Sequence, residues 1–574
     1  MRIAMTKLPF ALAASSLILL SACGGGSSSG NGNGGTTNQA PTGITVSANT
    51  VSENEAGATV GTISATDPNG DAITFTTTSD LFEISGTTLK LIDSVALNFE
   101  KTPSQSVSIT ATDSGGLSTT SNVTINVNDV LDTYTFADAD GNSTVAYSGQ
   151  TARMALIYEL NQYIGSELQT DLESGALTTR QAVIDKLNSF YEISAEDYDL
   201  IADTFAVDFI ETLEQTTLRE LSSSQKDLLG KIAGSDEVGQ HKDWNNGDFE
   251  GWGTVGSTTP HGLVQIYFGM LGDHAQEWID GNTRMDFNNN EITQIYLTTD
   301  GRDLKQLIQK FLLGAVAFSQ GADDYLDNDT DDKGLRSTNI AGSSVYTALE
   351  HQWDEGFGYF GAARDYLEYT DDEIAAKDGR EEYRSGRHDS NGDGFFDLMS
   401  EVNLGNSTNA AKRDRGTSAL TNPTDFTSAA FNAFLNGRKI INDNIGSELT
   451  TEQMNALVAE RDIVLEYWEK SISATVVHYI NDTLADLDAL GTNDFNYADL
   501  AKHWSEMKGF ALNLQFNRLS PLSDANYTQL HNLMQDAPVV SPQQDLDQYK
   551  ADLLTARGIL QTAYGFEAEH VENW

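Results

Sequence analysis

A histidine and a glutamate stand one helical turn apart in the segment 350–360, Glu-His-Gln-Trp-Asp-Glu-Gly-Phe-Gly-Tyr-Phe. On a helix, side chains four positions apart lie on the same face, so His351 and Glu355 can share a metal ion or a hydrogen bond. With Asp354 beside them as a general base, the pair would suit a metal-dependent hydrolase. The alternative is that these side chains only form hydrogen bonds between packed helices. The segment therefore predicts either a ligand or metal site or a buried helix crossing.

A second histidine and glutamate, His503 and Glu506, stand three positions apart in the segment 503–510 and predict a similar but weaker site. A third pair, His274 and Glu277, is weaker still. Each pair lies close to a tryptophan, which hints at a duplication of helical bundles within the chain. No His-Glu-x-x-His motif provides a zinc site with a general base, so a zinc protease of that kind is not predicted.

Residues 389–397, Asp-Ser-Asn-Gly-Asp-Gly-Phe-Phe-Asp, carry oxygen ligands at the spacing of an EF-hand calcium loop. Gly394 occupies position 6, where the sharp turn requires glycine, but position 12 is Ser400 and Glu401 comes one residue late. The alternative is a surface turn rich in Asp and Asn. The acidic run 327–332 has no glycine in register and is predicted to be a solvated loop. The candidate calcium ligands are Asp389, Asn391, Asp393, the carbonyl of Phe395, and Asp397.

The histidine pairs and the calcium loop all fall in a region whose apolar residues repeat at three- and four-residue spacing. That periodicity predicts helices, and only two prolines, Pro260 and Pro423, fall between residues 104 and 520 to interrupt them. We expect an α-helical domain over residues 133–574, built as two packed bundles with 133–340 and 341–574 as the candidate halves. The clearest helical stretches are 151–160, 304–318, 345–366, 452–480 and 497–516.

Residues 41–132 have a different period, in which apolar and polar residues alternate. Period two, with turns at 68–70 and 114–116, predicts the half-buried antiparallel strands of a β-sandwich. The expected fold class is therefore multidomain, a small all-β sandwich followed by a large all-α domain. The strands are expected near 43–47, 72–76, 88–91, 106–110 and 122–127.

The sandwich segment resembles a bacterial cadherin-like repeat. The resemblance rests on Ser-Glu-Asn at 52–54, Ala-Thr-Asp-Pro-Asn-Gly-Asp at 65–71, Leu-Asn-Phe-Glu at 97–100, Ala-Thr-Asp at 111–113 and Asp-Val-Leu-Asp at 129–132. In that family such carboxylates bind calcium at the end of the sandwich, which suits a hard cation that takes oxygen ligands from several loops. Leu131 and Asn98 depart from the family's usual Asn and Asp, and the alternative is that the acids are solvated turn residues. The resemblance implies as calcium ligands Glu53, Asp67, Glu100, Asp113, Asp129 and Asp132.

The start of the chain contains the only cysteine in 574 residues. A positive segment and an apolar run over residues 2–20 precede Leu-Ser-Ala-Cys, which ends at Cys23. This pattern resembles a bacterial lipoprotein signal, which implies a signal peptide over 1–22, acylation of Cys23 and a hold on the membrane through lipid. Gly24 in place of Asp favours the outer membrane of a Gram-negative bacterium, on its periplasmic or surface face. The alternative is a secretory signal with an incidental cysteine, and the Gly-, Ser- and Asn-rich residues 23–40 predict a flexible tether.

Acidic residues far outnumber basic ones, with 84 Asp and Glu against 34 Lys and Arg and a net charge of -50. This charge disfavours nucleic acid and anionic lipid as partners. The acids are spread along the chain, which fits a salt-adapted surface, cation binding or both. Because there is a single cysteine, no thiolate cluster is available, so any metal ion must bind through oxygen and imidazole ligands.

The helical part resembles a family of uncharacterised helical lipoproteins, matched here at 147–153 and 310–315 and at His351, Trp353, Asp354, Glu355, Gly358 and Tyr359. The His-x-x-Glu at 503–506 is similar to the signature of the imelysin group, whose paired four-helix bundles are associated with iron uptake. These resemblances imply a non-enzymatic, calcium-binding envelope protein whose helical domain binds iron, another transition metal or an iron carrier. The alternatives are a calcium-dependent adhesion or matrix protein with an envelope or cell-surface partner, and the metal-dependent hydrolase. The expected ligands in the helical domain are His351, Asp354, Glu355, His503 and Glu506.

Overall fold

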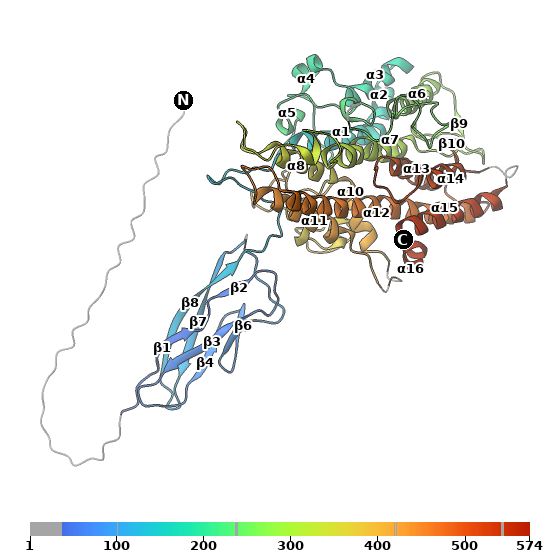
Figure 1. Ribbon diagram of the computed structural model, residues 1–574. Helices are drawn as coiled ribbons and strands as arrows, with labels where there is room; N and C mark the ends of the chain where they lie inside the picture. Colours follow the sequence, from blue (N-terminus) through green and yellow to red (C-terminus); the bar gives the residue numbers. More distant parts are fainter. Residues whose placement is uncertain (1–36, 100, 236–238, 418–419, 421, 541–544) are drawn as a thin grey trace, which may run out of the picture. The chain divides into compact units, whose positions relative to one another are not determined.

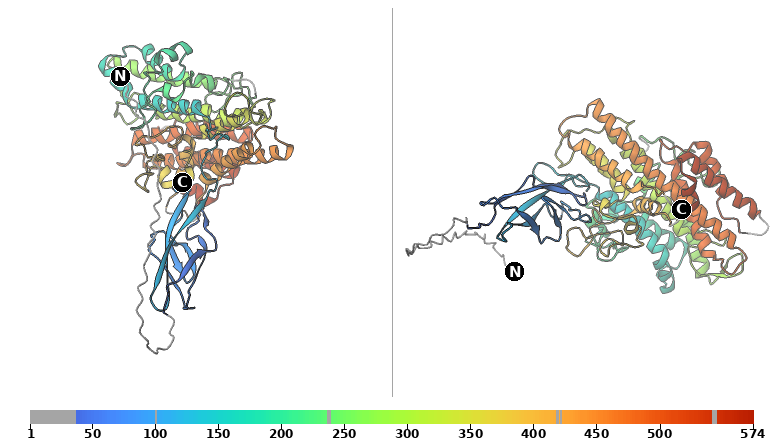
Figure 2. Two further views of the ribbon diagram at one scale, coloured as in Figure 1. Left: turned by 90° about the vertical axis from the view of Figure 1, so that its left-hand side faces the viewer. Right: turned by 90° about the horizontal axis from the view of Figure 1, so that it is seen from below.

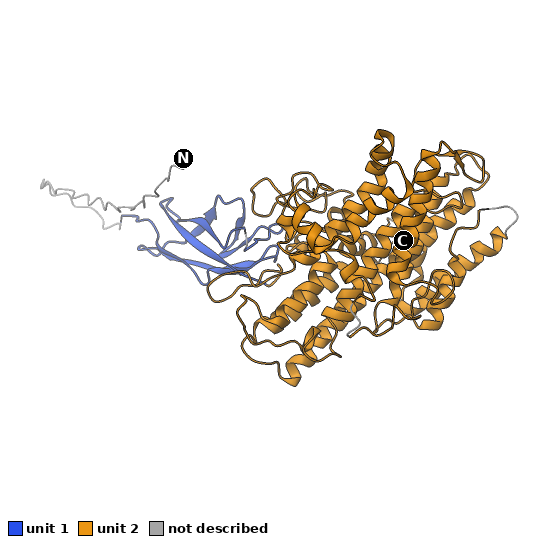
Figure 3. Ribbon diagram, turned by 90° about the horizontal axis from the view of Figure 1, so that it is seen from above, with its two compact units in different colours: residues 1–130 blue, residues 131–574 orange. Residues whose placement is uncertain are grey.

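The computed structural model divides the chain into two compact units, Met1–Val130 and Leu131–Trp574 (Figure 3). It describes residues 37–99, 101–235, 239–417, 420, 422–540 and 545–574. The expected signal peptide, Cys23, most of the tether and Glu100 lie outside these residues. In the described ranges, no helix combines the length and the apolar composition that crossing a membrane requires.

The first unit is a sandwich of two four-stranded sheets, with strand orders β1-β3-β6-β5 and β2-β8-β7-β4 (Figure 1). All the pairings within these sheets are antiparallel except that of β2 with β8, which is parallel. The strands are β1 (Thr42–Val46), β2 (Thr50–Ser52), β3 (Thr59–Thr66), β4 (Thr74–Thr77), β5 (Phe82–Ser85), β6 (Thr88–Leu91), β7 (Ser104–Thr112) and β8 (Ser118–Asn128).

Alternation of apolar and polar residues builds the sandwich core. In β7, Val107, Ile109 and Ala111 are fully buried, and the residues between them point away from the core. Their partners across the ladder lie on β8, where Val107 is opposite Val123 and Ile109 is opposite Ser121. Five of the eight strands coincide with predicted ones, while β2, β3 and β5 were not predicted.

The second unit is built from helices, so the predicted fold class is confirmed. The helices are α1 (Ser148–Gln162), α2 (Leu168–Ser174), α3 (Arg180–Tyr191), α4 (Ala195–Ile201), α5 (Leu218–Leu221), α6 (Pro260–Ile279), α7 (Leu304–Leu312), α8 (Ala348–Phe360), α9 (Asp371–Ile374), α10 (Gly405–Asp414), α11 (Phe426–Asn442), α12 (Thr451–Ala489), α13 (Tyr497–Ala511), α14 (Asp524–Met534), α15 (Leu546–Tyr564) and α16 (Ala568–Asn573). A short hairpin pairs β9 (Arg284–Met285) with β10 (Glu291–Ile292). The 39-residue helix α12 packs against α10, α11, α13 and α15 (Figure 2).

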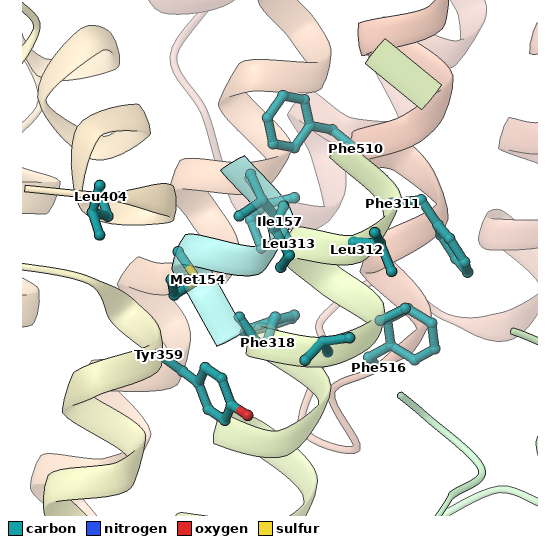
Figure 4. Close-up of a cluster of buried hydrophobic side chains, with 14 of the residues drawn as sticks. Met154, Ile157, Phe311, Leu312, Leu313, Phe318, Tyr359, Leu404, Phe510 and Phe516 are labelled. Atoms are coloured by element: carbon teal, nitrogen blue, oxygen red, sulfur yellow. The ribbon is translucent and has the colours of Figure 1, made fainter. Parts of the chain in front are cut away.

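One hydrophobic core runs through the whole helical unit instead of dividing at residue 340. Met154 of α1, Phe311 of α7 and Phe510 of α13 belong to the same cluster of buried side chains (Figure 4). The π-helical segment η3 (Leu313–Phe318) follows α7 and lies close to η7 (Leu512–Gln515), which follows α13. Gly314 permits this approach, since a Cβ there would lie 1.8 Å from Cγ of Asn513. The two candidate halves therefore share their core.

Candidate functional site

Helix α8 carries the His-x-Trp-Asp-Glu segment, and its ends are fixed by local hydrogen bonds. Thr347 accepts a hydrogen bond from the Glu350 amide at 3.1 Å, and the Glu350 carboxylate accepts one from the Thr347 amide at 2.6 Å. This capping box satisfies two amides that a helix start leaves open. Gly361 ends the helix with a φ of 85°, which a residue with a side chain rarely adopts.

One face of α8 is sealed into the core. Trp353 donates from Nε1 to the Phe434 carbonyl at 2.9 Å, and Gly437 of α11 leaves room for its ring. Arg438, also on α11, forms ion pairs with Asp354 at 2.9 Å and with Glu350 at 2.8 Å, and all three side chains are buried. Removing one partner of such a buried ion pair is costly, because the charge that remains is held away from solvent.

Asp354 was expected to act as a ligand or a base, and the structure places it elsewhere. Besides Arg438, it accepts hydrogen bonds from the Tyr134 hydroxyl at 2.8 Å and from the Ala146 amide at 3.1 Å. These donors occupy both carboxylate oxygens, and Asp354 is not among the residues that line the neighbouring cavity. Asp354 therefore holds three parts of the chain together instead of facing a ligand.

The opposite face of α8 lines a cavity of about 480 Å³. His351 Nε2 and Glu355 Oε1 are 3.7 Å apart there, as their spacing predicted. His351 donates from Nδ1 to the Ala146 carbonyl at 2.9 Å, which leaves Nε2 directed toward Glu355. Glu355 accepts a 2.6 Å hydrogen bond from Gln150, and burial raises the pKa of its carboxyl. The cavity wall is completed by the first turn of α1, the segment 222–231 and residues 324–333.

The His351 and Glu355 pair provides two potential metal ligands. Across the described part of the chain, no three His, Cys, Asp or Glu side chains are grouped so that they could hold a metal ion. What the pair offers a small ligand is an imidazole nitrogen and a carboxylate held in fixed orientation by Ala146 and Gln150. Gln150 was not predicted, because nothing in the local sequence links it to α8, 205 residues away.

His503 and Glu506 of α13 are not brought together as a site. His503 donates from Nδ1 to Asp486 of α12 at 2.8 Å, and its Nε2 lies 3.9 Å from Asp482. Glu506 is buried and faces Lys310 of α7, with Nζ and Oε1 3.4 Å apart. The two side chains therefore join α13 to two different helices. The third candidate, His274, binds the Ile295 carbonyl at 2.9 Å, and burial lowers its pKa to about 4.

The expected calcium ligands of the sandwich do not share one end of it. Asp67 follows β3 and Asp113 follows β7, whereas Glu53 follows β2 and Asp129 follows β8. Because β7 and β8 are antiparallel and β2 and β8 are parallel, these two pairs lie at opposite ends, roughly 30 Å apart for strands of this length. Asp132 falls in the helical unit, where its side chain is buried. The expectation that these carboxylates meet at one end of the sandwich is therefore wrong for these four residues.

Backbone amides hold the carboxylates at both ends. Glu53 accepts hydrogen bonds from the amides of Phe99 at 2.6 Å and Val130 at 2.7 Å. At the other end Asp113 Oδ1 accepts from the amides of Gly115 and Leu117, at 2.8 and 2.9 Å. The loops that carry these acids are thus ordered by the acids themselves.

The loop 389–397 forms a turn that its own carboxylates order. Asp389 accepts hydrogen bonds from the amides of three following residues, and Gly394 has a φ of 89° at the sharp turn. Glu401, one residue later than in an EF-hand, reaches back and accepts from the amides of Ser390 at 2.9 Å and Asp397 at 2.9 Å. Glu401 is buried and closes the loop from inside, a role that its sequence position did not predict.

The acidic run 327–332 is not wholly solvated, contrary to expectation. Asp327 is buried, and its Oδ1 lies 3.2 Å from the guanidinium of Arg518, which also pairs with Asp323 at 3.0 Å. Arg518 comes from a distant part of the chain, so the run alone could not indicate this pairing.

Comparison with known proteins matches part of the helical unit and, weakly, the sandwich. No curated protein matches. A crystal structure of human protocadherin-24 EC1-2 is similar at 22% identity and a TM-score of 0.15, over 17% of this chain and 47% of that one. The chain thus spans less than half of that structure, and the sandwich assignment stands on its own strand pairing. Residues 132–372, which include α1, the segment 222–231 and α8, match the family described as a domain of unknown function, DUF4856.

Proposed function

We propose that this protein is a lipid-anchored envelope protein whose helical unit binds a small ligand without transforming it. The cavity beside His351 and Glu355 carries the proposal. Its volume of about 480 Å³ falls within the range of small-molecule sites, and its polar groups are fixed in place by α1 and α8. Bare iron is a poorer match than an anionic carrier of iron, because the cavity wall is rich in lysine and arginine.

The ligand test is a thermal-stability screen of the purified full-length chain with anionic, neutral and cationic small molecules. Ser148 lines the cavity, so Ser148→Trp should fill it and abolish the stabilisation that a bound compound gives. Ser174→Trp, at an exposed position at the end of α2, is the matched control and should respond as the parent chain does. A compound that stabilises both variants equally binds elsewhere and counts against this cavity.

The anchor has its own test. Labelled fatty acid should be incorporated into the protein when it is expressed in Gram-negative cells. The Cys23→Ser substitution should abolish the labelling and release the protein from the membrane fraction. Label that persists in the Cys23→Ser protein would contradict acylation at this residue.

A second function, calcium binding, is favoured by one buried atom of the sandwich. Oδ2 of Asp67 is buried and has no hydrogen-bond partner, while Oδ1 accepts from the amides of Asn69 and Asp71. Hard oxygen donors at the ends of loops suit calcium. The sandwich would then be a calcium-stiffened spacer, or the contact surface of an adhesion protein.

Calcium should raise the unfolding temperature of the full-length chain. Asp67→Asn should reduce this shift, whereas Asp80→Asn, at an exposed turn, should not.

Asp393→Ala tests the loop in the helical unit in the same way, because Asp393 orders that loop by accepting a hydrogen bond from the Phe395 amide. Calcium-dependent self-association in sedimentation experiments would favour adhesion, and a calcium-bound monomer would favour the spacer.

A further inference from the structure

The cavity beside His351 and Glu355 concentrates positive charge in a protein whose net charge is -50. Against four cationic side chains it has two carboxylates, those of Asp324 and Glu355. Such a wall attracts anions, in contrast to the acidic composition of the chain as a whole. The four cations are Arg153, Lys226, Lys231 and Lys333.

Two of these cations form no direct ion pair with a carboxylate, although Asp227 acts on both from a greater distance and Glu355 acts on Lys226. Lys231 and Lys333 both approach Asp324, at 3.9 and 2.9 Å. Lys226 instead donates to the Ser224 hydroxyl at 2.6 Å and to the Gln225 carbonyl at 3.2 Å. Arg153 donates to the carbonyls of Asp227 and Gly149, at 2.8 and 3.3 Å. Within the described residues, no carboxylate oxygen lies within 4.0 Å of the Lys226 ammonium or the Arg153 guanidinium.

Lys226 and Arg153 meet at the start of α1. A Cβ placed on Gly149 would lie 2.5 Å from Cε of Lys226 and 3.6 Å from a terminal nitrogen of Arg153. The first turn of α1 has no acidic residue, and Tyr147 before it provides no side-chain cap. The start of a helix carries a partial positive charge of its own. Two cations beside it are therefore repelled by the helix and by each other unless an anion lies between them. Burial, and then the charge of Arg153, lowers the pKa of Lys226, which agrees with this crowding.

A second observation at the same wall points to a ligand. Gln150, in the first turn of α1, is 1% exposed, and its Oε1 has no hydrogen-bond partner. Its Nε2 donates a hydrogen bond to Oε1 of Glu355 at 2.6 Å, so the amide oxygen is the atom that lacks a partner. A buried amide oxygen is stable only when it accepts a hydrogen bond, which a ligand hydroxyl can donate. Three serines, Ser222, Ser223 and Ser224, add polar groups to the same cavity.

We infer that this cavity binds a small hydroxylated organic anion, with its phosphate or carboxylate against Lys226, Arg153 and the first turn of α1. A hydroxyl of the ligand donates to Gln150, and Glu355 accepts from another or from a ligand amine. This inference rests on the proposed function, since it names the ligand class of the same cavity. It explains why Gly149 has no side chain, because any larger residue would push Lys226 away from the helix start.

The test titrates the purified full-length chain with glucose 6-phosphate, galacturonate, inorganic phosphate and glucose, using calorimetry. We expect one of the two sugar anions to bind more tightly than phosphate, and glucose not to bind. Binding of glucose 6-phosphate would indicate a phosphate site, and binding of galacturonate would indicate a carboxylate site. Lys226→Gln should weaken this binding at least tenfold, while Lys439→Gln, which removes an exposed partner of Asp443, should not change it. Without ligand, Lys226→Gln should be at least as stable as the parent chain, because the substitution removes repulsion.

Equal binding of the sugar anion by the parent chain and Lys226→Gln would overturn the inference. If Lys226→Gln does not fold, Gly149→Ala displaces the same lysine and should give the same loss. Stabilisation by neutral compounds alone, lost in Ser148→Trp, would refute the anion assignment while the cavity remained a ligand site. Failure of every compound in the screen to bind would refute both the inference and the proposed function.

Discussion

Asp354 and Glu355 are neighbours in sequence, yet α8 places them in opposite environments. Asp354 points into the core and is neutralised by Arg438, whereas Glu355 faces a cavity beside His351. A motif that suggests one site in sequence thus forms two structures on one helix, a buried ion-pair clamp and one wall of an open cavity. Neighbouring side chains on a helix point about 100° apart, so residues that are adjacent in a motif need not share a face.

The largest expected effect comes from breaking the clamp. Arg438→Ala leaves Glu350 and Asp354 buried without their cation, and such a loss costs about 3–5 kcal/mol of stability. All seven tryptophans lie in the helical unit, so their fluorescence during urea unfolding reports on this unit alone. Arg384→Ala, which removes a partner of Glu381 at the surface, should leave the transition almost unchanged. A small effect of Arg438→Ala would mean that the clamp is not a stabilising contact.

The clamp can also be compared with a buried carboxyl that forms no ion pair with any residue the structure describes. Glu469 of α12 accepts hydrogen bonds from Asn517, Ser520 and Tyr564, and burial raises its pKa to about 7. A raised pKa gives stability that is complete below the unfolded pKa, near 4.5, and lost as pH rises through about 7. The loss should total about 3 kcal/mol. Urea unfolding at pH 5 and pH 8 should show most of this difference in the parent chain relative to Glu469→Gln, and parallel pH profiles would contradict it.

A substitution between the two faces should disturb both. A Cβ on Gly358 would lie 2.7 Å from Cβ of Tyr147, which precedes α1 and follows the Ala146 carbonyl that holds His351. Gly358→Ala should therefore cost about 1–3 kcal/mol by overpacking and also weaken ligand binding. Gly558→Ala, where a Cβ on α15 meets nothing within 4 Å, is the control and should not destabilise the unit. Normal binding by Gly358→Ala would show that the faces are independent.

The smallest stability effect should come from the open face. Glu355→Gln keeps the size of the side chain and removes a carboxylate that contacts His351 and Gln150. We expect the free energy of unfolding, measured with urea, to change by less than about 1 kcal/mol, because the cavity is partly open to solvent. Ligand affinity in the calorimetric titration should nevertheless change severalfold. A large loss of stability would place Glu355 with the clamp instead of the cavity.

The sequence predicted elements and local pairs well because these depend on period and spacing. The i, i+4 rule placed His351 beside Glu355, and the Asp and Gly pattern at 389–397 predicted a turn that forms. Arg438 and Gln150 were missed because each meets its partners on a helix that is distant in sequence. Lys226 was missed because its approach to Gly149 joins a loop to the start of a helix far away in sequence. The sandwich acids were misplaced for a related reason, since alternation identifies strands but not the direction in which each one runs.

The direction of the sandwich strands has a mechanical consequence. The chain enters at β1, whose Thr42 is paired with Thr66 beside the Asp67 loop, and leaves after β8 at the end marked by Glu53. A pull on the two termini of this unit therefore runs along the strands and must shear whole ladders of hydrogen bonds together, which is harder than opening them one at a time. The carboxylate loops at the two ends sit where such a load enters and leaves, so ordering them would set the force at which the unit yields.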